Sequence, residues 1–399
     1  MKVIRRALLL GLCLILLAGA AMAEEIVNLG GEGYDQLYYR CSLADGRFIL
    51  AGLRGEPGNY MNHKARLLCM NPDGTVSWEY IDPEGQSGMY GKAVVTDDGR
   101  ICAVFDDSPY QDMQAMSLKF FTPDGQPEGK PVPLDFSFGM EYWLTSRGLL
   151  TRSYNYGLNR CEFIEFMAWN GRTLFRHRGG LPVSFGPDDG VIAEDDGLVL
   201  YGSEPGDEGT AAKIMKVDYD GNILWSSILP LETDMGSACL VICERTQDGR
   251  YIGRGHELSG NNYTYWKAVF SADGRVLSRK EISYDDNSGD ETFDQDMMTE
   301  FRGKYMAMEV DSDGMALERT YRYLWFDADG NELGTTEARI GKDTLPGPVY
   351  GEDYVSYGGG QMIPAGDYLW MTFNYRENND DLEKEMGSCE EILVRVPVL

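Results

Sequence analysis

Short apolar runs, broken by glycine turns, make up most of the chain. Stretches such as Arg66–Met70 and Lys213–Val217 are apolar or alternate between apolar and polar residues. This two-residue alternation is the pattern of a half-buried β-strand, and the 3.6-residue period of a helix is almost absent. The pattern therefore predicts an all-β protein.

One turn sequence recurs along the chain, each time directly after such a strand. Its third residue is Asp or Asn and its fourth is Gly, which suits a type I turn followed by a glycine in the left-handed conformation. Such a turn closes a tight antiparallel hairpin. Successive copies lie 46 to 56 residues apart and end at Gly74, Gly125, Gly171, Gly221, Gly274 and Gly330.

A second series of hairpin turns interleaves with the first. Its glycines are Gly46, Gly99, Gly148, Gly197, Gly249, Gly303 and Gly366. Each period of about 50 residues therefore holds two hairpins, or four antiparallel strands, which is typical of a β-propeller blade.

The two series differ in number, and the difference predicts how the ring closes. The first series has six copies and the second has seven, so the last unit ends after Glu391–Val396 without a fourth strand. An extra strand, Glu24–Leu29, precedes the first unit. We expect this strand to complete the last blade, which leaves no unpaired edge. Residues 24–399 are thus predicted to form one seven-bladed propeller domain, with eight blades as the alternative.

Two stretches carry a resemblance to a known repeat. Lys213–Trp225 reads strand, Asp-Tyr-Asp-Gly turn and tryptophan, and Leu67–Trp78 has the same order. Both resemble the repeats of quinoprotein-like propellers, the PQQ-like repeat type, and the resemblance implies a propeller fold. Quinone-dependent activity is not implied, because adjacent paired cysteines are absent. The turns also have Asp-Gly where the sialidase aspartate box has Asp-x-Gly, so no catalytic residue is transferred.

The first 23 residues are predicted to be an export signal. Lys2 and Arg6 lie in a basic region, Ala7–Met22 is apolar, and Ala21–Ala23 has the small-x-small form of a cleavage site. An apolar run of this length is short for a membrane span. We expect cleavage after Ala23 and a secreted protein, extracellular or in the cell envelope. An uncleaved anchor is the alternative.

Charge limits the partners. The chain has 36 Lys and Arg against 64 Asp and Glu, a formal net charge of −28. Such a surface repels nucleic acid and anionic membranes, so neither nucleic-acid binding nor stable membrane insertion is expected.

A content of 43% hydrophobic residues is enough to fill a large core. We expect a monomer.

The positions of the cysteines and histidines in the sequence argue against a reactive thiol and against a metal site. Seven cysteines follow the signal, most of them in apolar runs and none in a Cys-x-x-Cys motif, and we expect buried free thiols. His63, His177 and His256 are scattered, which argues against zinc. We expect His63 and His256 in surface loops.

A ligand is predicted to bind at the face opposite the hairpin turns. In a propeller both hairpin series lie at one face, and the longer, more variable loops form the other. The loops between blades are acidic and the outer loops are rich in Tyr and Asn, and aromatic faces with amides and carboxylates suit glycans and peptides. The candidate ligand-binding residues are Tyr60, Tyr110, Tyr154, Tyr156, Tyr263, Tyr265, Trp266, Asp188, Asp234 and Asp286.

No cofactor is expected, with calcium as the one ion that such loops could take. The acidic stretch Asp285–Glu291 lacks the alternating oxygen spacing of a known calcium loop. No nucleophile elbow, phosphate loop or dinucleotide motif occurs. No catalytic residue and no metal ligand is therefore assigned.

The interpretation that follows is a secreted, non-catalytic propeller. It would bind a glycan, a peptide or an envelope protein through its loop-rich face. One alternative is a polysaccharide lyase or glycoside hydrolase with its site in the central funnel, since paired carboxylates are plentiful. The other is a structural or sensor module of the cell envelope.

Overall fold

The computed structural model describes residues 26–30, 35–56, 59–83, 88–107, 116–134, 140–155, 160–181, 183, 190–206, 209–229, 237–259, 262–282, 298–311, 318–341, 354–357, 361–377 and 389–399. Throughout these ranges the regular structure is β-strand, with no helix, as the sequence predicts. The predicted export signal, residues 1–23, lies outside them.

The strands follow one another in antiparallel groups of four along the chain. The first group is β2 (Asp35–Ser42), β3 (Phe48–Glu56), β4 (Asn59–Met70) and β5 (Val76–Ile81). The second is β6 (Met89–Val95), β7 (Ile101–Asp106), β8 (Met116–Phe121) and β9 (Pro127–Leu134). The third is β10 (Met140–Leu144), β11 (Gly148–Asn155), β12 (Arg160–Ala168) and β13 (Thr173–Arg178).

The next two groups are joined into one eight-stranded sheet by a single parallel bridge between Thr210 and Ser237. They are β14 (Val191–Glu194), β15 (Gly197–Gly206), β16 (Gly209–Asp218) and β17 (Ile223–Ile228), then β18 (Ser237–Arg245), β19 (Tyr251–Ser259), β20 (Asn262–Phe270) and β21 (Val276–Ile282). A further sheet contains β22 (Met298–Phe301), β23 (Lys304–Asp311), β24 (Glu318–Phe326) and β25 (Glu332–Gly341).

The last sheet combines both ends of the chain. Its strands are β26 (Tyr354–Tyr357), β27 (Met362–Ala365), β28 (Tyr368–Glu377), β29 (Cys389–Arg395) and β1 (Ile26–Asn28). β26 and β27 pair with different parts of β28, so they lie along the same edge of that strand. β1 is antiparallel to β29, with Ile26 opposite Val394. The predicted pairing of the N-terminal strand with the last strand is therefore present.

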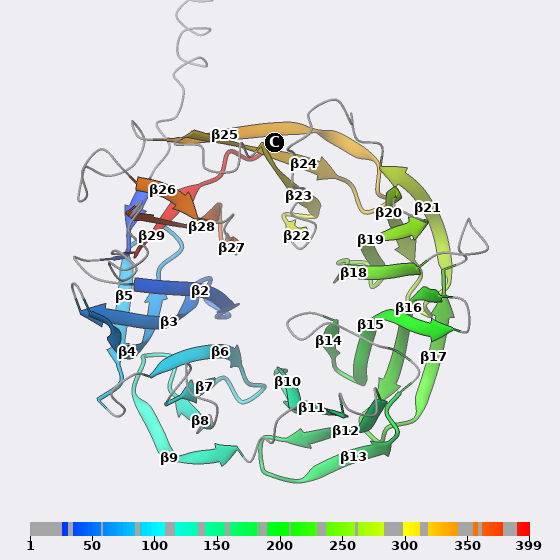
Figure 1. The fold of residues 1–399 in the computed structure, drawn as a ribbon, viewed down its shortest axis with the longest axis horizontal. Coiled ribbons are helices and arrows are strands. Elements are labelled where there is room, and N and C mark those ends of the chain that lie inside the picture. The colour runs from blue at the N-terminus through cyan, green and yellow to red at the C-terminus, as the bar shows by residue number, and fades with distance from the viewer. Residues whose placement is uncertain are drawn as a thin grey trace, which may run out of the picture.

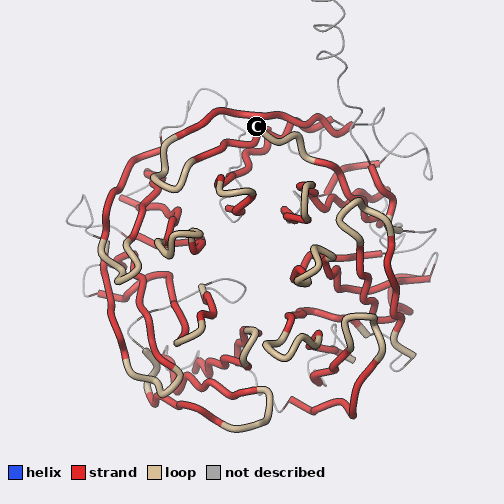
Figure 2. The backbone as a smooth tube through the Cα atoms, turned by 180° about the vertical axis from the view of Figure 1, so that it is seen from behind, coloured by secondary structure: helices blue, strands red, loops and turns tan. Residues whose placement is uncertain are grey.

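The sheets stand around a central axis, in a propeller-like arrangement (Figure 1). From the β2–β5 group to the β22–β25 group, the first strand lies nearest the axis and the fourth lies at the rim, and in the last sheet β27 lies nearest the axis (Figure 1). Figure 2 shows the same arrangement of strands around the axis from behind. Because each sheet stands on edge, its two faces are covered by the neighbouring sheets and its innermost strand presents a backbone edge to the axis.

The hairpin turns have the predicted conformation. In Thr246–Arg250, for example, Thr246 N–H donates to Arg250 O at 2.8 Å and Gly249 N–H donates to Thr246 O at 2.9 Å. Gly249 has φ +83°, which a residue with a side chain adopts only at a cost. A Cβ on Gly46, in one series, would lie 3.3 Å from Pro72 of the other. The two series thus meet at one end of the strands, which we call the hairpin end.

Apolar clusters fill the spaces between successive sheets. The last and first sheets share one of them, in which Trp370 and Leu393 are buried with Leu37 and Leu50. A buried arginine holds the connection between these sheets: Arg66 donates to the Leu29 carbonyl at 2.9 Å and to Glu79 at 2.7 Å.

Several of these contacts place an aromatic ring on a turn glycine of the next sheet. Trp78 donates its Nε1–H to Pro123 O at 2.9 Å, and a Cβ on Gly125 would lie 2.6 Å from its ring. Trp225 lies on Gly274 in the same way. Glycine is required at these positions for two reasons: the backbone has a positive φ, and the ring leaves no room for a Cβ.

Gly125→Ala should destabilise the protein more than Gly171→Ala. Both glycines have φ near +80°, but no atom lies within 4 Å of a Cβ on Gly171. Gly171→Ala should therefore cost only the backbone strain, about 1 kcal/mol. Gly125→Ala must also displace Trp78, so we expect a total of about 2 to 4 kcal/mol. Urea unfolding of both variants measures the difference, and equal losses would contradict the ring-on-glycine contact.

Candidate functional site

The predicted ligand-binding residues are only partly within the described residues. Tyr110, Tyr156, Asp188, Asp234 and Asp286 lie outside them. Tyr60, Tyr154 and Tyr263 lie at the ends of β4, β11 and β20 that face away from the hairpin turns. The topology thus brings these three backbone positions to the same end of their sheets, which we call the loop end.

Tyr265 and Trp266 are adjacent in β20 but lie in different environments. Tyr265 is half-buried, and its ring packs edge-on against His256 with centroids 6.4 Å apart. Trp266 is 1% exposed and belongs to the apolar cluster between the β14–β17 and β18–β21 groups. The expectation that Trp266 lies in a loop is therefore wrong, since it lies in a strand with its side chain buried. Strand alternation turns neighbouring side chains to opposite faces, and the face of Trp266 is the packed one.

The two histidines expected in loops lie in strands instead. His63 is in β4 and is fully buried, and His256 is in β19 and is half-buried. The polar residues around these histidines fit either the end of a strand or a loop, so the sequence did not show that the strands extend this far.

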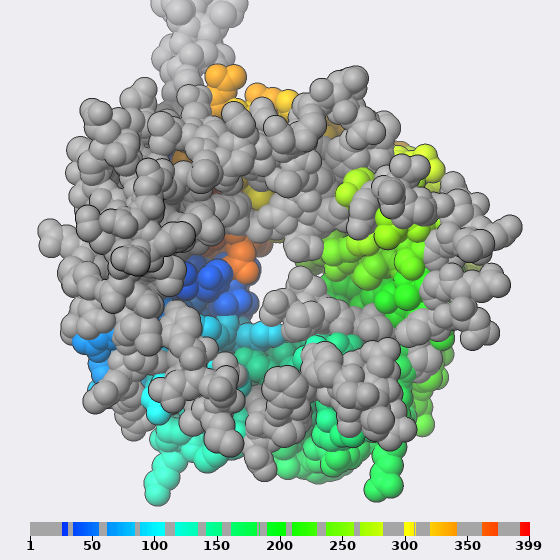
Figure 3. All heavy atoms as spheres, viewed as in Figure 1, coloured from blue at the N-terminus to red at the C-terminus, as the bar shows by residue number. Residues whose placement is uncertain are grey.

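Cations and aromatic rings meet on the inner strands. Arg40 lies over the ring of Tyr38, both in β2, at 5.0 Å. Lys92 of β6 donates to Tyr142 O of β10 at 3.0 Å and lies 4.9 Å from that tyrosine's ring centroid. The space-filling view shows an opening along the axis bordered in part by β2, β6 and β27 (Figure 3). Two cation–aromatic contacts thus lie on innermost strands of the sheets.

A buried tyrosine–glutamate pair lies at the hairpin end. Glu194, 8% exposed, accepts from Lys216 at 2.6 Å, from Tyr251 at 2.7 Å and from Arg245 at 2.9 Å. Burial, and then the hydrogen bond to Glu194, raises the pKa of Tyr251 well above its usual value. A tyrosine held in its protonated form is a poor nucleophile. This cluster therefore joins two sheets rather than activating a phenol.

A second buried ionic group joins the first two sheets. Asp82 accepts from Lys119 at 2.8 Å and from the hydroxyl of Tyr90. Lys119 also lies 3.9 Å from the ring centroid of Phe105. Neither this group nor the Glu194 cluster could be found from sequence spacing, because the partners come from different strands.

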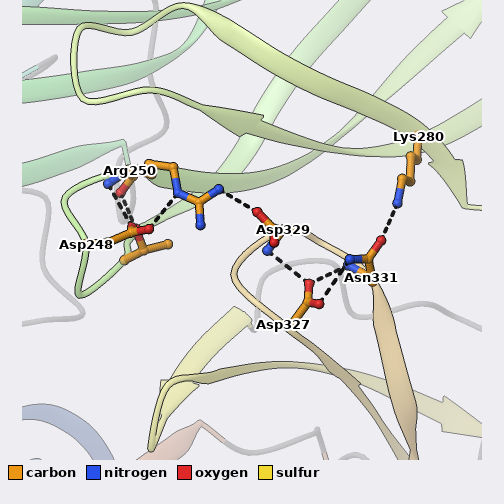
Figure 4. Close-up of polar contacts among 7 residues, drawn as sticks. Asp248, Arg250, Lys280, Asp327, Asp329 and Asn331 are labelled. Carbon is orange, nitrogen blue, oxygen red and sulfur yellow. Dashed lines mark hydrogen bonds and ion pairs between the residues drawn. The ribbon is translucent and has the colours of Figure 1, made fainter.

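The carboxylates of the hairpin turns accept hydrogen bonds from other side chains of the protein. Asp248 accepts from Arg250 Nε at 2.8 Å, and Arg250 reaches Asp329 of the next sheet at 2.6 Å (Figure 4). The hydrogen bonds from Arg100 and then Thr96 lower the pKa of Asp98 to about 2. Carboxylates engaged in this way already have strong donors. Across the described ranges, no three His, Cys, Asp or Glu side chains form a group that could hold a metal ion.

The described thiols are free and unreactive. Cys41, Cys69, Cys102, Cys161, Cys239 and Cys243 are not in disulfides. Burial raises the pKa of Cys41 to about 12 and that of Cys69 to about 11. Since the thiolate is the reactive form, these side chains act as small apolar groups, as the sequence predicts.

Comparison with known proteins gives likenesses of fold only. No protein-family model matches the chain, and no curated protein matches it. A prolyl endopeptidase structure is 15% identical with a TM-score of 0.48, covering 86% of this chain but 45% of its own length. The subtype N11 neuraminidase-like protein of A/flat-faced bat/Peru (H18N11) is 11% identical, with a TM-score of 0.43 and coverages of 76% and 86%.

An α-L-arabinanase of Penicillium chrysogenum is 13% identical, with a TM-score of 0.39 and coverages of 76% and 92%. Likenesses this distant say nothing about activity, so the functional argument rests on the residues themselves. The part of the chain that the structure describes contains no helix with the length and hydrophobicity to span a bilayer.

The free energy of unfolding should fall in alkaline solution. The pKa values of Cys41 and Tyr39 are both raised to about 12 by burial, so the folded chain holds these protons more tightly than the unfolded chain. This stabilisation is complete below the ordinary thiol value of 9.0 and is lost as the pH rises toward 12. Urea midpoints at pH 8 and pH 10.5 test this, and an unchanged midpoint would contradict the burial of these groups.

Proposed function

We propose that the chain is an exported, closed seven-bladed propeller that binds a ligand or partner without catalysis. The pairing of β1 with β29 supports closure, as does the apolar cluster shared by the last and first sheets. The quinoprotein-like resemblance is part of the proposal. Trp78 and Trp225, which carry it, both lie on the turn glycine of the next sheet.

The observation that carries the proposal is the contrast between the two ends of the strands. At the hairpin end, short turns close on themselves and their carboxylates are bound by residues such as Arg100 and Arg250. Polar groups that already have partners inside the chain offer little to a ligand. Recognition therefore falls to the loop end and to the axial opening beside it, where tyrosine positions gather.

The buried tyrosine, thiols and glutamate described above favour binding over catalysis. General acids and nucleophiles need a pKa near the working pH and access to substrate. Tyr251 and the six free thiols have raised pKa values, and Glu194 is surrounded by three donors. These groups stabilise the contacts between sheets.

The partner that fits best is a glycan, a peptide or an envelope protein. Aromatic faces such as Tyr38 and Tyr142 pack well against sugar rings and against side chains. The net charge of −28 disfavours nucleic acid and favours neutral or basic partners. Calcium remains part of the proposal as a bridging ion at the loop end, and the protein is proposed to act as a monomer.

A glycan and peptide array, probed with the protein in calcium and in chelator, tests this function. We expect binding to one ligand class, and Tyr265→Ala should weaken it about tenfold, since truncating an aromatic anchor removes a large contact. Asp273→Ser changes an exposed turn at the opposite end and should leave binding unchanged.

Three results would count against the proposal. Equal losses in the two variants would mean that the loop end is not the binding end. Cleavage of any arrayed glycan would favour the lyase or hydrolase alternative. Absence of binding with and without calcium would leave the structural or sensor role.

A further inference from the structure

Three cations form a row across β19, β20 and β21. Arg254 lies directly opposite Lys267, and Lys267 lies directly opposite Lys280. Residues paired in this way share one face of the sheet, and like charges placed there repel each other. The chain has only 36 bases against 64 acids, so a row of three bases is an unusual concentration. This arrangement of like charges costs stability.

The row runs from solvent into the junction with the β22–β25 sheet. Lys280 is exposed, Lys267 is half-buried and Arg254 is 3% exposed. Lys267 Nζ lies 4.0 Å from the ring centroid of Phe326, and its stem lies beside Gly330. Access from solvent to the row is therefore greatest at Lys280 and decreases through Lys267 to Arg254.

The aromatic ring that lies on a turn glycine at three other junctions is missing at this one. Four residues after the turn glycine, the outer strands of other sheets carry Trp78, Phe175 and Trp225, and each ring lies on a glycine of the following sheet. The equivalent residue of β21 is Ser278, and its neighbour Leu277 is 52% exposed. The stem of Lys267 and a methyl group of Val269 lie next to Gly330 instead of a ring.

Neither lysine of the row forms an ion pair with a carboxylate of the described residues. Lys280 donates to the neutral Asn331 Oδ1 at 2.8 Å (Figure 4). Asp327 accepts from the backbone N–H of Asn331 at 2.8 Å and from its Nδ2 at 3.0 Å, so both of its oxygens are engaged. Within the described residues, Lys267 Nζ makes neither a hydrogen bond nor an ion pair, and its cation–π contact with Phe326 stands alone.

The charges that face Lys267 come from three elements. Burial, and then the charge of Lys280, lowers the pKa of Lys267 to about 8. Arg254 lowers this pKa further, whereas Glu332 and Asp327 raise it. The ammonium is thus held in a setting that favours its charged form less than water does.

We propose that Lys267 and Lys280 form a binding site for a small oxyanion of the phosphate or sulfate type, with Arg254 on the same face of the sheet behind them. Neighbouring strands are about 4.8 Å apart, so one tetrahedral oxyanion can reach the ammonium groups of both lysines. Charge-assisted hydrogen bonds to its oxygens would replace repulsion by attraction. The ion would occupy the mouth of the junction, where a ring is absent.

Site-resolved acetylation of the full-length protein tests the site. Lysine acetylation rates are followed by mass spectrometry from pH 6 to 10, in inorganic phosphate or in chloride of equal ionic strength. In chloride, Lys267 should titrate near pH 8. Phosphate should slow its acetylation at pH 8 by about threefold or more, because a bound anion raises the amine pKa and covers the amine. Lys130, exposed on β9, serves as the internal control and should respond to neither anion.

Two variants locate the effect. Lys280→Gln, an exposed change that should not disturb folding, is expected to abolish the phosphate protection of Lys267. The matched change Lys130→Gln should leave that protection intact. The proposal is overturned if Lys267 reacts equally fast in phosphate and chloride, or if its protection persists in Lys280→Gln.

Discussion

The contact between the last sheet and the first is the interaction on which the rest of the structure depends. Sheets that stand on edge around an axis bury their faces only against each other, so a chain of such sheets has two apolar ends unless they meet. Here Trp370 lies on Gly74 and donates to Pro72 O at 2.9 Å, while β1 covers the edge of β29. Arg66 then fixes the chain where it passes from one sheet to the other.

Within this frame the two ends of the strands have different roles. At the hairpin end, the turns supply donors to their own carboxylates and to those of the next sheet. Arg250, for example, pairs with Asp248 of its own turn and with Asp329 of the next sheet. The buried groups around Asp82 and Glu194 extend this network into the junctions. Polar groups that hold the sheets together cannot also serve a ligand, so the proposed function lies at the loop end and along the axis.

The strands and turns could be predicted because their causes are local. A glycine that needs positive φ, such as Gly125, and a two-residue alternation are visible in any single repeat. The pairing of the N-terminal strand followed from counting turns. Trp266 was misassigned because its burial depends on which face of β20 meets the neighbouring sheet, and adjacent residues differ in this respect.

The chemistry that depends on register could not be predicted. Tyr251 and Glu194 are 57 positions apart, and no spacing rule connects them. Arg254, Lys267 and Lys280 form a row only once β19, β20 and β21 are aligned. In each case the sequence supplies the residue types and the strand pairing creates the group.

The most direct test of the account is hydrogen exchange at the junction between the ends of the chain. Amide exchange of Ile392–Val394 is compared between the intact protein and a variant lacking residues 24–30. Successive N–H groups of β29 point alternately to β1 and to β28, so the account predicts fast exchange in the variant at those of these amides that point to β1, together with a lower urea midpoint. Unchanged protection and an unchanged midpoint would contradict closure by the N-terminal strand.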